Sequence, residues 1–119
     1  MGLEKKVKRV LCYLAVAFLA ACGQADGDKW APDAAHLEVQ NLFKGDAEPT
    51  AKDALWTKQD IFKVGVIDDG TSRNGYAEYV CSVLYDYGFS GKRIWVQVID
   101  IVQLSSSGKW AKLGEARCN

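Results

Sequence analysis

The strongest constraint on this chain is a short apolar run near its start. Residues 10–21 form the run, and residues 5–9, Lys-Lys-Val-Lys-Arg, place positive charge directly before it. The run is too short to span a bilayer, because a membrane-spanning helix takes about 20 apolar residues. The pattern is typical of a secretory signal peptide, which is removed from the mature protein. We therefore expect residues 1–21 to lie outside the folded domain.

The run ends in Leu19-Ala20-Ala21-Cys22, a sequence that resembles the lipobox of bacterial lipoproteins. In that family a diacylglyceryl group is attached to the cysteine sulfur and the signal is cut just before the cysteine. The resemblance covers residues 1–22 and implies that lipid on Cys22 anchors the protein in the cell envelope. Two or more acyl chains give stable attachment, at about 0.8 kcal/mol per buried CH₂. The alternative is an ordinary signal peptide with an incidental cysteine.

The residues after the lipobox predict a location and a domain boundary. Enterobacterial lipoproteins with Asp after the cysteine stay in the inner membrane, so Gly23 implies the outer membrane in a Gram-negative host, facing the periplasm or the cell surface. Residues 22–31 are mostly small and polar, which predicts a flexible tether. Residues 32–119 are enough for one globular domain.

The charge balance argues against a nucleic-acid partner. Residues 1–21 hold four basic residues and one acidic residue out of 15 of each, so removing them leaves a net charge near −3. A mildly acidic domain lacks the basic footprint that nucleic-acid binding requires. Membrane lipid through acylated Cys22 and an envelope protein are the partners we expect.

The cysteines predict one disulfide. Cys12 lies in the signal segment and Cys22 in the lipobox, which leaves Cys81 and Cys118 in an oxidising compartment. Closing this loop is worth about 4 kcal/mol in the chain-entropy model. A metal or redox site is the alternative, but no CxxC motif and no histidine lies near either cysteine. We expect no cofactor and no metal.

Hydrophobic periodicity and turn residues predict a small α+β domain with the order α-β-α-β-β. Residues 76–87 fit either a helix or a strand, and Gly88 after them favours the helix. A three-stranded sheet with two helices on one face and one disulfide follows. The expected elements are a helix at 33–44 with Asp33 as N-cap, a helical turn at 51–56, a strand at 62–67, a helix at 76–87, and strands at 93–104 and 109–117.

The segment 68–75 is the main candidate for a ligand site. It follows a strand and precedes a helix, where sites of α/β proteins often lie. Arg73 and a helix N-terminus suit an anion, whereas Asp68 and Asp69 suit a hard cation such as Ca²⁺. The spacing matches neither an EF-hand nor a P-loop. The alternative is a polar turn that caps the helix.

Two single residues were considered for catalysis. His36 is the only histidine, and without a second histidine or a nucleophile motif we interpret it as a surface residue. Asp100 interrupts an apolar strand. It is either a buried functional acid, a bulge residue, or the partner of Arg93 or Lys109 in an ion pair.

Aromatic residues are abundant for so small a domain, with four Trp and, outside the signal segment, four Tyr: Trp30, Trp56, Trp95, Trp110, Tyr76, Tyr79, Tyr85 and Tyr87. Either some form an exposed patch that binds a partner, or they cover a thin sheet. We therefore expect a non-enzymatic interaction or accessory module in the envelope. The alternatives are a surface inhibitor of a secreted enzyme and a small ligand-binding or ion-binding domain that uses residues 68–75.

Overall fold

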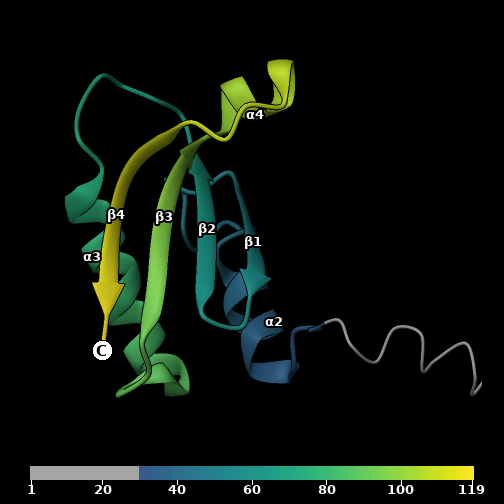
Figure 1. Ribbon diagram of the computed structural model, residues 1–119, viewed down its shortest axis with the longest axis vertical. Helices are drawn as coiled ribbons and strands as arrows, with labels where there is room; N and C mark the ends of the chain where they lie inside the picture. The colour runs from purple at the N-terminus through teal and green to yellow at the C-terminus, as the bar shows by residue number, and fades with distance from the viewer. Residues whose placement is uncertain (1–29) are drawn as a thin grey trace, which may run out of the picture. The chain divides into compact units, whose positions relative to one another are not determined.

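A four-stranded mixed sheet organises the domain (Figure 1). The computed structural model describes residues 30–119, in which Ala31–Asn119 form one compact unit. The strands lie in sequence order across the sheet, with β1 antiparallel to β2, β2 parallel to β3, and β3 antiparallel to β4. Their bounds are Asp53–Lys58 for β1, Ile61–Val66 for β2, Ile94–Asp100 for β3 and Lys112–Cys118 for β4. The α+β class is confirmed.

The first strand corrects the prediction of a helical turn at 51–56. Ala54 and Trp56 are buried whereas Leu55 between them is exposed, which is the two-residue alternation of a strand. A short turn joins β1 to β2, since Lys58 already pairs with Ile61. The sheet therefore has four strands rather than three, because this segment pairs along β2.

The third strand ends earlier than expected. The apolar pattern predicted a strand over 93–104, but β3 stops at Asp100 and the helix α4 (Ile101–Ser107) follows directly. Asp100 is the N-cap of α4, and its side chain accepts the backbone N–H groups of Val102 and Gln103. The connection to β4 therefore contains a helix instead of a tight hairpin turn.

Helices cover one face of the sheet. They are α2 (Ala34–Leu42), α3 (Asn74–Leu84) and the short segment η1 (Tyr85–Phe89), in which Tyr87 and Gly88 depart from helical backbone angles. Asp33 is the N-cap of α2, as predicted. Figure 1 shows α3 running behind β3 and β4, the strands it contacts, and it links the parallel strands β2 and β3. The fully buried side chains between the two layers include Val39, Phe43, Phe62, Val64, Val66, Val80, Leu84, Val96 and Val98.

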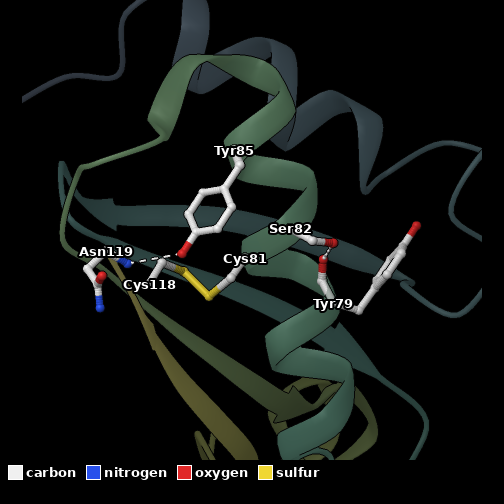
Figure 2. Close-up of a disulfide and its surroundings, with 6 residues drawn as sticks. All are labelled: Tyr79, Cys81, Ser82, Tyr85, Cys118 and Asn119. Carbon is white, nitrogen blue, oxygen red and sulfur yellow. Dashed lines mark hydrogen bonds between the residues drawn. A yellow bond between two sulfur atoms is a disulfide. The ribbon is translucent and has the colours of Figure 1, made fainter.

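The predicted disulfide is present and fastens α3 to the end of β4 (Figure 2). Cys81 and Cys118 have Cα atoms 5.5 Å apart and are both buried. Beside them the Tyr85 hydroxyl accepts a hydrogen bond from the Asn119 backbone N–H. The bond therefore ties the middle of the chain to its last strand.

The predictions about the signal segment and the anchor fall outside the described residues. They concern residues 1–21, the lipid on Cys22 and most of the segment 22–31. Within residues 30–119 no helix has the length and apolar character needed to cross a bilayer.

Candidate functional site

The sheet face opposite α3 carries a different set of side chains from the core face. Strand register places Leu55, Lys63, Gln97 and Glu115 side by side across all four strands. The next row is Trp56, Phe62, Val96 and Ala116, which pack in the helix-covered core. We call the sheet face that carries Leu55, Lys63, Gln97 and Glu115 the open face. Its other members are Ile61, Gly65, Trp95, Ile99, Lys112 and Arg117, with Ile101, Leu104 and Trp110 at the end next to α4.

Cationic side chains lie over both tryptophans of the open face. The Arg117 guanidinium carbon is 4.1 Å from the centre of the Trp95 ring, and Lys112 Nζ is 5.2 Å from it. Lys63 Nζ lies 4.8 Å from the centre of the Trp110 ring. Such contacts are attractive and worth about 0.5–1 kcal/mol each at exposed positions. They hold three positive groups in defined positions on the surface.

Glu115 is the carboxylate within this cluster. Its Oε1 accepts hydrogen bonds from Trp95 Nε1 at 2.8 Å and from Lys112 Nζ at 2.9 Å. These bonds, the one from Lys112 first, hold the pKa of Glu115 below its ordinary value. At the opposite edge of the sheet Asp53 pairs with Lys44 at 3.8 Å. The centre of the open face is therefore positive, although residues 22–119 together are net negative.

A small apolar cleft lies at the α4 end of the open face. Its volume is about 80 Å³. A Cβ on Gly65 would lie 2.8 Å from Ile101 Cδ1, so the glycine is what allows Ile101 to lie directly on the sheet. The apolar lining comes from Leu55, Gly65, Ile99, Ile101, Leu104 and Trp110.

A wider groove opens at the other end of the open face, where β2 and β3 begin. Its volume is about 660 Å³, and Arg93 and Arg117 line it together with Trp95. Asp60 and the terminal Asn119 contribute polar groups. Two positive side chains therefore face this groove together with one carboxylate, that of Asp60.

Side chains bind N–H groups on both edge strands of the sheet. On β1 the Ala54 N–H donates to Asp53 Oδ1 and the Trp56 N–H donates to Gln40 Oε1. On β4 the Glu115 N–H donates to Asn74 Oδ1. Free N–H groups on an edge strand invite pairing with another chain. Satisfying them here favours contact through the face over addition of a strand.

Most polar groups of the segment 68–75 bind one another or adjacent backbone. Asp68 accepts the Gly70 N–H at 2.8 Å, and Asp69 accepts the Thr71 N–H and hydroxyl at 3.0 and 2.6 Å. The bonds from Thr71 hold the pKa of Asp69 below its ordinary value. Arg73 donates to the Ile67 carbonyl oxygen at 2.8 Å and lies 3.5 Å from Asp69 Oδ2. These contacts build a turn. Within residues 30–119 no group of three or more His, Cys, Asp and Glu side chains is placed to hold a metal ion.

The interpretation of His36 as a surface residue is wrong. Its side chain is only 12% exposed, and its ring packs edge-on against Trp56 and Phe89 at centroid distances of 4.4 and 5.0 Å. Nδ1 lies 2.7 Å from Asp33 Oδ1 and Nε2 lies 3.0 Å from the Gln59 carbonyl oxygen. The bonds from His36 hold the pKa of Asp33 below its ordinary value. The ring therefore joins α2 to the β1–β2 turn.

Asp100 is buried, but its role is to cap a helix. Its Oδ1 accepts the N–H groups of Val102 and Gln103 at 3.0 and 3.2 Å, and its Oδ2 accepts Gln103 Nε2 at 3.0 Å. The bond from the Gln103 side chain is the main reason that the pKa of Asp100 is lowered. Of the alternatives considered for Asp100, an ion pair with Arg93 or Lys109 is not the one observed, because its carboxylate oxygens bind Val102 and Gln103.

Neither a protein-family model, nor a curated protein, nor a solved structure matches this chain.

Proposed function

We propose that this protein is a lipid-anchored module of the bacterial cell envelope and that it acts by contact rather than catalysis. Two features support a location in the cell envelope. The segment Leu19–Cys22 has the lipobox pattern, and the Cys81–Cys118 disulfide suits an oxidising compartment. The lipid on Cys22 is the membrane anchor, in the outer membrane if the host is Gram-negative.

The observation that carries the contact function is the tryptophan–cation array on the open face. Trp and Arg are enriched among the residues that dominate binding energy at protein interfaces. Trp110 is 47% exposed and Leu55 is 45% exposed, so both are available to a partner. The side chains considered for chemistry, His36 and Asp100, are instead tied into the fold by hydrogen bonds to neighbouring elements.

Site-specific photocrosslinking in intact cells tests the contact surface. A benzophenone amino acid at Trp110 or Leu55 should form a crosslink to an envelope protein. Tyr79 on α3 is the matched control, since it is 45% exposed and belongs to the opposite side of the sheet. Crosslinks from position 79 alone, or from none of the three positions, would reject the open face as the contact surface.

The anchor is tested by mass spectrometry of the protein extracted from the envelope. The wild-type chain should begin at Cys22 and carry the added mass of its acyl groups. Cys22→Ser should accumulate as an unprocessed precursor, because the serine hydroxyl cannot replace the thiol. Cleavage without lipid in the wild-type protein would refute the anchor.

A further inference from the structure

We propose that the open face binds an extended acidic segment of a partner protein, with one aliphatic side chain of that segment in the apolar cleft. This inference rests on the proposed contact function and names the chemistry of its partner. It combines three observations on the open face: the held cations, the small cleft and the distance between them.

The cations favour carboxylates. Arg117 and Lys112 lie over Trp95, and Lys63 lies over Trp110. The carboxylate of Glu115 accepts a hydrogen bond from Lys112. Because the rings hold these side chains, less conformational entropy is lost when a partner binds. A guanidinium group also matches a carboxylate in geometry and can donate two parallel hydrogen bonds. The charge of the face therefore complements an acidic partner.

The cleft favours a partner that offers one aliphatic group, such as a protein side chain, over an anionic polysaccharide. Its volume of about 80 Å³ is well below the ~150 Å³ of an apolar cavity that accepts benzene. Sites for whole small molecules are larger still, at about 300–1,000 Å³. A single aliphatic side chain suits this space, and the cleft is lined by apolar groups such as Leu55, Ile99 and Leu104.

The distance between the two features sets the spacing of the bound segment. Trp95 and Ile99 are four residues apart on β3, which corresponds to about 13 Å along a strand. An extended segment would therefore carry the acidic residue that meets Arg117 roughly four positions from the aliphatic one. An acidic residue for Lys63, which itself lines the cleft, would lie close to the aliphatic one. Because side chains bind N–H groups on both edge strands, the segment would lie along the open face and bind through its side chains.

Peptide selection on the full chain in detergent micelles tests this inference. A phage-displayed library of random peptides should yield sequences with one aliphatic residue and an acidic residue three to five positions away. A fluorescent copy of the best peptide should bind about tenfold more weakly to Lys63→Met, Arg117→Met and Trp110→Ala. Methionine keeps an apolar stem over each ring. Arg117→Lys keeps the charge but loses the paired guanidinium donors, so its affinity should lie between those of Arg117→Met and the wild-type protein.

The control variant is Lys92→Met, which removes one positive charge from the groove that His36 and Phe89 line on the helix side. It should bind the peptide as the wild-type protein does. Circular dichroism and an intact disulfide would establish that each variant is folded. If Arg117→Met does not fold, Lys112→Met takes its place in the binding assay, and the same loss of peptide affinity is expected.

Three results would overturn the inference. One is selected peptides without the acidic–aliphatic spacing. Another is affinity that does not change in Lys63→Met and Trp110→Ala. The third is that polyglutamate, dextran sulfate or phosphatidylglycerol vesicles bind equally well to the wild-type protein and to Trp110→Ala. Such a result would mean that the open face binds anions in general. If crosslinks form at position 110 but no such peptide is selected, this inference fails while the contact function stands.

Discussion

The two faces of the sheet are stabilised in different ways. The helix-covered face is closed by apolar side chains, among them Val64, Val96 and Leu84, which are fully buried. Burial of such residues is worth about 1.5–3 kcal/mol each. On the open face the interactions are cation–π contacts and hydrogen bonds around Trp95 and Trp110, each of which contributes less.

This difference separates stability from recognition. A substitution in the helix-covered face changes the packing that holds the fold, so its effect on binding cannot be told from unfolding. The open face holds exposed Leu55 and Trp110, whose removal leaves the core untouched. Long Lys and Arg stems lie over the rings and keep their charged ends in water. The open face can therefore vary with the partner while the fold is kept.

Removing the disulfide should have the largest effect on stability. The Cys81→Ala/Cys118→Ala variant frees a loop with a sequence separation of 37 residues, which should lower the free energy of unfolding by about 4 kcal/mol. Urea denaturation followed by tryptophan fluorescence measures the change. An unchanged midpoint would mean that the apolar layer alone holds α3 on the sheet.

A methyl group at Gly114 should have the next largest effect. A Cβ there would lie 2.7 Å from the Arg73 carbonyl oxygen and 2.5 Å from the Asn74 nitrogen, so backbone must move. We expect Gly114→Ala to lower the free energy of unfolding by about 1–3 kcal/mol, the usual cost of overpacking. Faster amide exchange at the start of α3 would locate the damage.

Gly75→Ala is the matched control for this substitution. Gly75 lies in α3, and a Cβ there would meet nothing within 4 Å. Because alanine favours helices, this variant should gain about 0.5–1 kcal/mol. Destabilisation by both variants would show that the close approach of α3 to β4 is not the cause.

The sequence predicted the elements whose hydrophobic pattern is long or whose ends carry clear signals. This group contains the strand near 62–67 and the helix at 76–87. The Cys81–Cys118 pairing was predicted differently, because the signal segment and the lipobox account for the other two cysteines. The prediction of a helical turn at 51–56 was wrong because Thr50 and Asp53 resemble a helix-capping pair. Only Ala54 and Trp56 show the alternation of buried and exposed residues that marks a strand. The apolar run after residue 93 contains a helix cap at Asp100, which the hydrophobic pattern does not reveal.

The candidate site could be predicted only in part. An aromatic surplus was evident, but the cations that lie over Trp95 and Trp110 were not identified. Finding them requires the strand register. A register shift beside Ile99 places Lys112 opposite it, and such a shift depends on how the strands pair rather than on local sequence. The segment 68–75 looked like a site because its polar residues are those that build turns.

The smallest expected effect concerns Glu115, and it tests whether the open face adds stability through charge. Hydrogen bonds from Lys112 and Trp95 lower the pKa of Glu115 in the folded protein. A carboxyl with a lowered pKa stabilises the fold above its ordinary pKa of about 4.3, and this contribution is lost as the pH falls through the lowered value. Glu115→Gln should therefore be less stable than the wild-type protein at neutral pH, with the difference disappearing in acid. Urea denaturation across this pH range measures it, and Glu78→Gln on α3 controls for the loss of one negative charge. A difference that persists unchanged in acid would mean that Glu115 acts through its shape and packing, and the open face would then contribute no pH-dependent stability through this residue.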